Sequence, residues 1–431
     1  MFISANDEKN QLKLNYLLSY LIVFLLLLFL ASLVTEKYFA KGYVHFLMLI
    51  GFGFIIYSNL NKRLFSTSEE SLIRFSVLAY LLVLTGFFFQ NPDYTRFGRA
   101  LETQAAHLIP LLLFPILYAV RRYITIEFLA WCLILAALTS FFVTVIAYFE
   151  GFLVAGHRGG GQVHGAPIIY GNLSMLFGVL SIAMSLYFYS QEKIYFYFLI
   201  LGAVLAILSS LFSGTRGGWI VLFTLPFFLI PAWGFKSAWR YILSYLFILT
   251  LISIFIYFNV SSIGSRIDAL FEELRLLVND SSYAGGSLGS RLVFWEMSFK
   301  AFISSPIIGI GAGEFYSFLQ HQHQLGFLPE NLIDFKHAHN EYLSILSSYG
   351  LVGVFLYLTF LIWLLRLFKS YLNRSSREVR IFGLLGIVTI FCYLEFSLTE
   401  SFLTSQLGLP AFYFITGMLI FLAEKYHKGL K

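Results

Sequence analysis

Arg216 stands in a setting where a guanidinium could bind an anion. It lies in segment 213–219, Ser-Gly-Thr-Arg-Gly-Gly-Trp, at a break between two apolar runs. Glycines on both sides remove steric cover, so that a bulky ligand could approach the guanidinium closely. Arginine suits phosphate, because its donors form a planar fork with a fixed charge. An interfacial anchor that only seeks water at a membrane boundary is the alternative interpretation.

A second arginine, Arg291, follows Gly289 and Ser290 and precedes an apolar stretch. This pattern predicts an amphipathic helix over 291–303 with Ser290 as its N-cap. At a helix start, backbone N–H groups and the positive end of the helix dipole would help the guanidinium to bind an anion. The alternative is an arginine in a solvated loop.

Two glycine-rich stretches predict loops first and ligand sites second. Residues 158–167 contain one fixed charge, Arg158, and ligand contact is only a secondary role for such a loop. Residues 309–313, Gly-Ile-Gly-Ala-Gly, lack the Lys-Ser/Thr of a phosphate loop and do not follow a strand in a βαβ unit. They predict a flexible turn that lines a cavity rather than a nucleotide site.

Four histidines are concentrated in one segment, as the pairs His321 and His323, and His337 and His339. A zinc site is one interpretation, but no His-Glu-x-x-His or Asp-x-Asp motif accompanies them, and we expect no metal site. The remaining interpretations are structural histidines or one general base, since imidazole titrates close to physiological pH. Nothing in the local pattern separates His337 from His339 in that role.

Membrane helices must position these residues. Of 431 residues, 58% are hydrophobic and only 12% charged, with a mean hydropathy of +0.78. So little charge does not cover a soluble surface, and several apolar runs of about 20 residues can each cross a hydrocarbon layer roughly 30 Å thick. The runs are continuous rather than alternating, which predicts helices and not barrel strands. The chain is therefore predicted to be an all-α polytopic membrane protein, which excludes a fibre, a disordered chain and a cytosolic enzyme.

About twelve spans are predicted, at 14–34, 43–60, 72–90, 103–120, 124–148, 166–189, 194–212, 217–234, 239–258, 341–365, 381–399 and 407–424. The distribution of Lys and Arg places both termini in the cytoplasm. The net charge of +6 is explained by this topology, so we infer no nucleic-acid partner from it. Cys132 and Cys392 lie inside apolar runs, which leaves no disulfide framework.

One long outer segment, 259–340, has room for structure outside the membrane. Apolar residues at helical spacing predict amphipathic helices over 263–278 and 291–303, which would lie in the interface or cover the mouth of the bundle. The expected organisation is therefore helices 1–9 in residues 1–258, the outer loop in 259–340 and helices 10–12 in 341–431.

Taken together, these motifs resemble the bacterial O-antigen ligase family, whose relatives include O-antigen polymerases and protein O-oligosaccharyltransferases. His339-Asn340, nine further residues and Gly-Leu-Val-Gly at 350–353 resemble the ligase signature. The family's other landmarks are similar to Thr-Arg-Gly-Gly-Trp at 215–219 and to Ser-Arg-x-x-Phe-Trp-Glu at 290–296, followed by Ser-Pro-Ile-Ile-Gly-Ile-Gly at 305–311. The resemblance is specific from Arg216 to Gly353 and extends loosely over the whole chain.

The resemblance implies a C-type glycosyltransferase (GT-C) fold in the bacterial inner membrane, with the outer segment and the active site in the periplasm. Such a protein moves a glycan from undecaprenyl diphosphate to lipid A–core. Arg216 and Arg291 would hold the diphosphate, and His339 would be the base toward the acceptor hydroxyl. Because two fixed cations could neutralise the leaving group, we predict inverting transfer with no metal or other cofactor. Further residues expected to contact the substrates are Arg158, Arg266, His337 and Asn340.

Other functions are compatible with the same residues. A polymerase would join repeat units on the same lipid carrier with similar donor chemistry. A protein O-oligosaccharyltransferase is less favoured, because those enzymes usually carry an additional periplasmic domain. A flippase or transporter should have charges near the membrane midplane, whereas here the notable charges gather at the outer ends of the spans, apart from Glu395.

Overall fold

A computed structural model of the protein describes residues 5–60, 74–78, 106–151, 160–233, 238–279, 286–403 and 405–427. Within these ranges every regular element is a helix. In chain order the elements are α1 (Ala5–Ser32), α2 (Lys37–Leu60), η2 (Ala106–Leu108), α5 (Ile109–Ala119), α6 (Ile126–Phe149), α7 (Gly160–His164), α8 (Pro167–Phe188), α9 (Lys193–Phe212), α10 (Arg216–Trp233), α11 (Ala238–Asn259), α12 (Ser261–Asn279), α13 (Gly286–Ser304), α14 (Phe315–Gln324), η3 (Glu330–Leu332), α15 (Glu341–Leu372), α16 (Arg377–Phe396) and α17 (Gly408–His427).

Seven of the described helices are long and apolar enough to cross a membrane: α6, α8, α9, α11, α15, α16 and α17. Shorter apolar helices cover Leu17–Ser32, Ile109–Ala119 and Arg216–Ile230. The prediction of an all-α, multi-pass membrane protein is confirmed. The full number of twelve spans stays a prediction, because most of the predicted span 72–90 lies outside the described residues.

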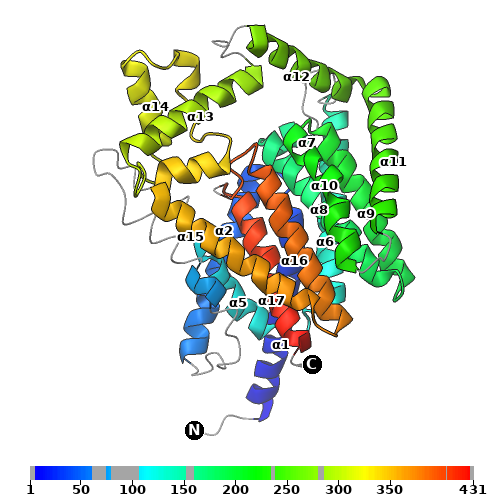
Figure 1. The fold of residues 1–431 in the computed structure, drawn as a ribbon. Helices are drawn as coiled ribbons and strands as arrows, with labels where there is room; N and C mark the ends of the chain where they lie inside the picture. Colours follow the sequence, from blue (N-terminus) through cyan, green and yellow to red (C-terminus); the bar gives the residue numbers. More distant parts are fainter. Residues whose placement is uncertain are drawn as a thin grey trace.

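The helices pack around α8 and α17, which are buried over most of their length. Helix α8 contacts α6, α9, α10 and α16, while α17 contacts α5 and α16. Helix α11 has few buried residues and contacts α10 and α12 at one side of the bundle (Figure 1). Most of its apolar side chains are therefore uncovered by the described residues, with Ile242 as a buried exception, as expected for a helix that faces lipid.

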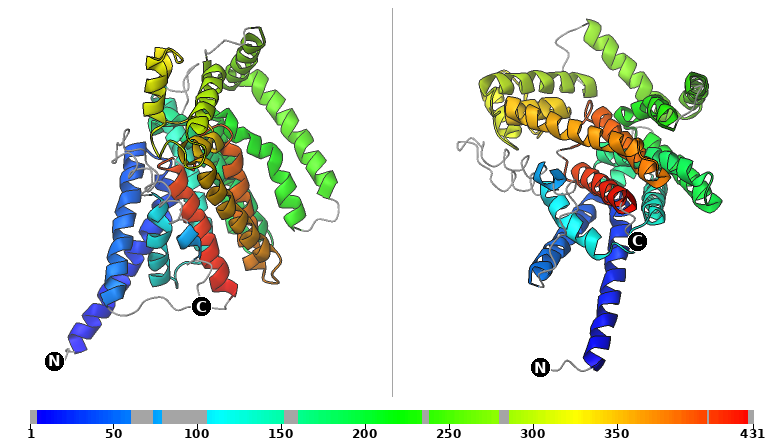
Figure 2. Two further views of the ribbon diagram at one scale, coloured as in Figure 1. Left: turned by 60° about the vertical axis from the view of Figure 1, so that its left-hand side comes forward. Right: turned by 60° about the horizontal axis from the view of Figure 1, so that its bottom comes forward.

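The outer segment lies at the opposite end of the bundle from the start of α1 and the end of α17 (Figures 1 and 2). The amphipathic helix predicted over 263–278 is confirmed as α12. A second apolar cluster holds the rest of this segment together, and its buried members come from α13, α14, η3 and the loops before η3 and α15: Phe294, Met297, Phe315, Leu319, Leu328, Leu332 and Ala338. Leu292 and Phe299, on another face of α13, are exposed.

Helix α15 is broken at Gly350, which has φ 60° and ψ −157°, a conformation adopted almost solely by glycine. Segment 306–311 fills the break. Four backbone hydrogen bonds join the two segments, from Ile310 to Ser347, Gly311 to Ser348, Leu351 to Pro306 and Val352 to Ile307. The turn that we expected to be flexible is thus tied to α15, and its last glycine, Gly313, lines a cavity.

Substitution of Gly350 by alanine is expected to destabilise the protein strongly. A Cβ at Gly350 would lie 2.6 Å from the Ile307 carbonyl group, which is backbone and has little freedom to move. Gly326 is a matched control, because its φ is also positive but a Cβ there would meet nothing within 4 Å. We expect Gly326→Ala to cost about 1 kcal/mol from backbone strain alone and Gly350→Ala about 3 kcal/mol or more, since overpacking adds to the strain. Thermal unfolding in detergent measures the stability of both variants. Equal melting temperatures would contradict the close packing of segment 306–311 against Gly350.

Candidate functional site

His339 and Glu400 form a close and mostly buried side-chain pair at the start of α15. The Nδ1 of His339 lies 2.9 Å from Oε2 of Glu400, and the Nδ1 of His337 lies 3.4 Å from the other carboxylate oxygen. The backbone N–H of His339 donates to His337 Nδ1 at 3.4 Å. This pattern assigns the His339 proton to Nδ1, where it donates to Glu400, and leaves the lone pair on Nε2 available to a ligand.

The backbone of His339 is unusual in a way that bears on the site. Its φ of 51° is positive, and it is the one non-glycine residue with this property among the described residues. Histidine enters this conformation more readily than most residues, yet it is uncommon and often marks functional positions. The ring packs against the aromatic rings of Phe294 and Phe335, with centroids 6.2 and 5.8 Å away. Apolar rings beside the His339–Glu400 pair strengthen its electrostatic interaction by excluding water.

Glu400 lies in the loop between α16 and α17, and several hydrogen bonds fix that loop against the start of α15. The Glu341 amide donates to the Ser397 carbonyl, and the Leu403 amide donates to the Glu341 carboxylate at 2.8 Å. Asn340 caps α15 by accepting from the Leu343 amide, and its Nδ2 donates to the Leu398 carbonyl at 3.3 Å. The loop is thereby held against the start of α15 on both sides of Glu400. Asn340, expected to contact substrate, has its side-chain amide in these structural bonds.

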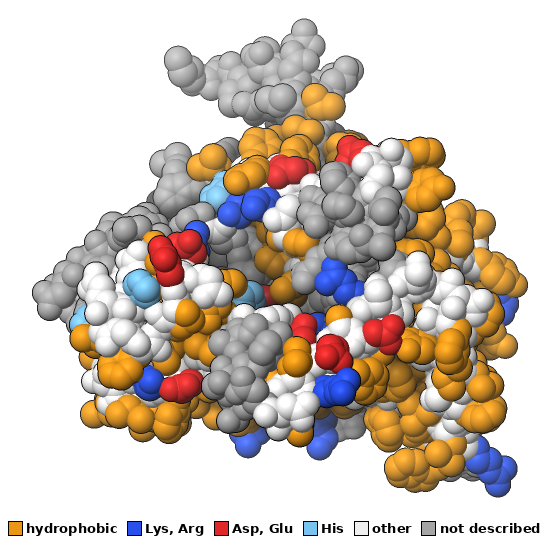
Figure 3. Space-filling model, turned by 90° about the horizontal axis from the view of Figure 1, so that it is seen from above, with side chains coloured by type: hydrophobic (Ala, Val, Ile, Leu, Met, Phe, Trp, Pro, Cys, Tyr) orange, Lys and Arg blue, Asp and Glu red, His pale blue; other side chains and the backbone are white. Residues whose placement is uncertain are grey.

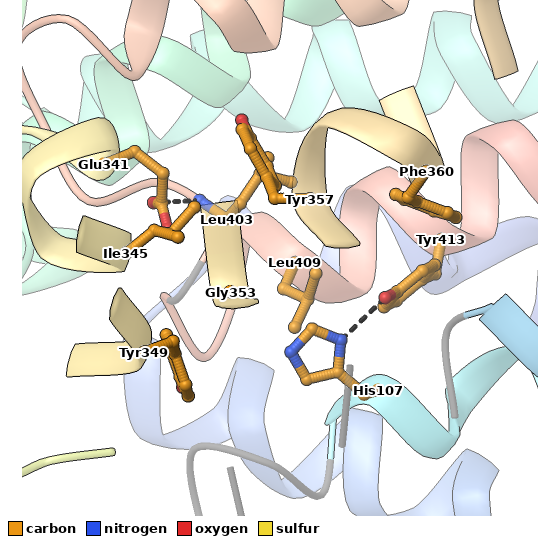
Figure 4. Close-up of a pocket in the computed structure, with 10 residues that line it drawn as sticks. All are labelled: His107, Glu341, Ile345, Tyr349, Gly353, Tyr357, Phe360, Leu403, Leu409 and Tyr413. Atoms are coloured by element: carbon orange, nitrogen blue, oxygen red, sulfur yellow. Dashed lines mark hydrogen bonds between the residues drawn. The ribbon is translucent and has the colours of Figure 1, made fainter. Parts of the chain in front are cut away.

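A small pocket of about 50 Å³ lies beside this junction (Figure 4). Glu341 and the Leu403 amide stand at one end, and His107 is hydrogen-bonded to the Tyr413 hydroxyl at the other, with Nδ1 and oxygen 2.6 Å apart. Its lining is otherwise mainly apolar, from α15 and α17. The pocket is too small for a substrate, and its two hydrogen-bonded ends serve to join the helices that carry the site.

The charge balance of the cluster keeps Glu400 ionised. Burial by itself raises the pKa of this carboxyl, but His337, His339 and the Ser401 amide together lower the pKa well below its ordinary value. Partial removal from water lowers the pKa of His337, against the opposing effect of Glu400. His337 is thus neutral at physiological pH, and the carboxylate is available to stabilise positive charge on His339.

Arg291 belongs to the same electrostatic group. Burial lowers its pKa, Glu400 and Glu273 oppose that shift, and Arg216 adds to it. The guanidinium remains charged at physiological pH. Its position on the helix differs from our expectation, because α13 begins at Gly286, so that Ser290 is not the N-cap and Arg291 does not open the helix. The Ser290 hydroxyl instead donates to the Gly286 carbonyl within the first turn.

Arg216 opens α10, as expected for a turn between two spans. Its Nη1 donates to the backbone carbonyl of Arg266 on α12, at 2.9 Å. Its charge interacts with those of Glu273 and Arg266, and Arg291 interacts with it in turn. A helix start is therefore found at Arg216 rather than at Arg291, and the positive end of the helix dipole there suits an anion. The amides of Arg216 and Gly218 already donate to the carbonyls of Gly214 and Thr215.

The glycines after Arg216 do not have the role that we expected. A Cβ at Gly217 would lie 2.0 Å from the Thr399 hydroxyl, and one at Gly218 would lie 2.8 Å from Asn172 Oδ1. They thus allow α10 to pack closely against α8 and against the loop that carries Glu400, instead of leaving room for a ligand. The prediction of an open approach at these two positions is wrong, because close helix packing uses the space.

The remaining predicted residues fall in different places. His321 and His323 are on α14, and His323 is hydrogen-bonded to the Leu328 carbonyl. Neither belongs to the group formed by His337, His339 and Glu400. Arg158 lies outside the described residues. Seen from the α12–α14 end, the face is hollowed, and histidine, basic and acidic side chains border the hollow (Figure 3).

Sequence reasoning missed two acidic residues, Glu400 and Glu273. Glu273 accepts from the Leu288 amide at 2.7 Å and interacts with both arginines. Glu400 follows the predicted span 381–399 directly, and an ionisable residue at the edge of a span is a functional candidate. Its position at the end of a predicted span was the sequence signal that could have identified Glu400 as a site residue.

His337, His339 and Glu400 also have the geometry of a possible metal site, since one ligand atom from each lies within 4.8 Å of the others. Two imidazoles and a carboxylate are a donor set that zinc accepts. The fixed carboxylate that the sequence motif lacked is therefore supplied by the fold. The same three groups equally form a hydrogen-bonded base, so an experiment must separate the two roles.

The comparisons with known proteins agree with the resemblance. Residues 201–358, from α9 to α15, match the family model described as O-antigen ligase. A protein of Haemophilus influenzae described as uncharacterized is 27% identical over 394 residues, which cover 89% of this chain and 93% of that protein. The recognition made from the motifs is confirmed, and the match indicates a transferase of lipid-linked glycans.

Proposed function

We propose that the protein is an O-antigen ligase of the GT-C type. It transfers a glycan from undecaprenyl diphosphate to lipid A–core on the periplasmic face of the bacterial inner membrane. The observation that carries the proposal is the electrostatic group formed by Arg216, Arg291, Glu400 and the His337–His339 pair, within and beside the matched family region. Arg291 and the two histidines belong to the outer segment, which lies at the end of the bundle opposite the start of α1 and the end of α17 (Figure 1).

The proposed chemistry follows from these charges. The acceptor hydroxyl attacks the anomeric carbon of the donor sugar while the bond from that carbon to the diphosphate oxygen breaks. His339 Nε2 takes the hydroxyl proton, and Glu400 stabilises the resulting imidazolium through the bond to Nδ1. The diphosphate leaves with the electron pair, and Arg216 and Arg291 stabilise its charge. A single displacement of this kind inverts the anomeric configuration.

A gene-deletion phenotype distinguishes ligase from polymerase. A ligase mutant should accumulate long glycan chains on the lipid carrier and lack them on lipopolysaccharide. A polymerase mutant should instead show surface glycans stalled at one repeat unit. Lipopolysaccharide gels run beside the lipid-linked pool measure both, and the second pattern would replace the ligase assignment.

Transfer is expected to be independent of divalent metal, because the two arginines supply the positive charge that a metal would bring. Purified protein treated with a chelator should retain its rate with lipid-linked donor and lipid A–core. The His337–His339–Glu400 cluster makes this a sharp test. Activity that is lost on chelation and returns with zinc or another divalent ion would overturn the metal-free mechanism.

A further inference from the structure

A cavity of about 410 Å³ opens on the α2 side of His337 and plays no part in the mechanism above. Its volume is within the range of small-molecule sites. Residues from α2, α8, α14, α15 and the loops before α15 and α17 line it. Segments that are far apart in sequence therefore line this cavity together.

The lining is basic. Lys37 and Lys41 from α2 and Lys336 from the loop before α15 contribute ammonium groups, and the described lining contains no Asp or Glu. Four serine hydroxyls and the Gln406 amide add neutral hydrogen-bonding groups. The neighbouring Glu36 carboxylate caps α2 by accepting from the amides of Tyr38 and Phe39. Ammonium groups gathered around neutral donors and acceptors suit a phosphorylated sugar, since lysine binds phosphate as a point charge.

The position relative to the histidines indicates which substrate would enter. His337 belongs both to the cavity lining and to the catalytic cluster, and its ring centroid lies 4.4 Å from that of His339. Neither Arg216 nor Arg291 is part of the lining. A sugar bound there would thus approach His339 from a different side than a diphosphate held by the arginines. An acceptor and a donor must approach the base in this way, from two different sides.

On this basis, and resting on the proposed function, we propose that the cavity binds a phosphorylated sugar of the acceptor glycolipid. Lys37, Lys41 and Lys336 hold the phosphate, and the adjoining sugar presents its hydroxyl to His339. The α2 lysines could bind the phosphate of membrane phospholipid headgroups by the same chemistry. The experiment therefore also tests the dependence on phospholipid.

The test uses the full chain in nanodiscs, with lipid A–core as acceptor in native and phosphatase-treated forms. The double variant Lys41→Gln/Lys336→Gln is compared with the wild type, and Lys300→Gln is the control, because Lys300 is paired with Glu296 on α13. We expect the KM for native acceptor to rise about tenfold or more in the double variant, with kcat and donor KM nearly unchanged. With phosphatase-treated acceptor, the wild type itself should show the raised KM. The double variant should raise the KM for this acceptor little further.

Other outcomes overturn the inference. An unchanged acceptor KM, or an effect confined to donor KM, would remove the acceptor assignment. An effect that varies with the content of anionic phospholipid in the nanodisc, but not with phosphate on the acceptor, would make the lysines headgroup anchors. Equilibrium binding of the two acceptor forms to wild type and double variant gives a readout that does not need turnover. Absence of transfer by the wild type would refute the proposed function, whereas equal binding of both acceptor forms would refute the cavity assignment.

Discussion

Replacing Arg291 by alanine is expected to reduce glycan transfer by about 10²-fold or more while the protein still inserts and folds. The reason is that a buried cation aimed at a developing negative charge is worth several kcal/mol in the transition state. Arg291 is partly buried, and its charge is balanced by Glu400 and Glu273 rather than fixed by a single partner. Initial rates with lipid-linked donor and lipid A–core, at saturating concentrations of both, measure the effect.

Two comparisons make this test specific. Arg291→Lys keeps the charge but loses the planar fork, so an intermediate rate is expected. Arg275→Ala is the matched control on α12, since Arg275 is exposed and only weakly paired with Glu272 at 3.9 Å. Arg216→Ala should lose as much activity, with some loss of stability, because it also removes the hydrogen bond to the Arg266 carbonyl. Wild-type activity in either Arg291→Ala or Arg216→Ala would remove the diphosphate assignment.

The second large effect is expected from the histidine and its carboxylate. His339→Ala should abolish transfer, because no other described imidazole has both a 2.9 Å bond to Glu400 and the second ring nitrogen available. Glu400→Gln should lower kcat by about 10²-fold or more with little change in KM, since the amide removes the charge that stabilises an imidazolium and that fixes its tautomer. The dependence of kcat on pH should change with it.

His337 separates the competing interpretations. The proposed base mechanism predicts that His337→Gln keeps kcat close to wild type, because His337 lies farther from Glu400, at 3.4 Å, and accepts from a backbone amide. His323→Gln on α14 controls for loss of a histidine as such. If His337→Gln is as inactive as His339→Ala, and both lose a bound divalent ion, the cluster is a metal site and the base assignment falls.

Much of the architecture could be predicted from local pattern. Continuous apolar runs set the spans that became α6, α8, α9, α11 and α15 to α17, because helix length and hydrophobicity are properties of consecutive residues. The same holds for α12, whose apolar spacing predicts its extent within a few residues. The start of α13 escaped this reasoning, because Gly286 precedes a weakly apolar turn that carries no periodic signal.

The side chains with catalytic chemistry were also visible in the sequence, since Arg216, Arg291 and His339 stand in motifs of recognisable spacing. Their environment was not. Glu400 is 61 residues from His339, and the glycines after Arg216 serve helix packing rather than ligand access. Such pairings depend on how helices cross and on loops closed by hydrogen bonds between distant segments, and no local pattern encodes them.

The amino-acid sequence by itself determined a membrane bundle with cationic and imidazole groups at one end, because composition and spacing are read from consecutive residues. Only the tertiary structure decided which of the two histidines lies closer to the carboxylate, that Arg216 rather than Arg291 opens a helix, and that lysines of α2 share a cavity with His337. The physical reason is that these relations arise from packing and long-range hydrogen bonds, whose partners are chosen when the helices assemble.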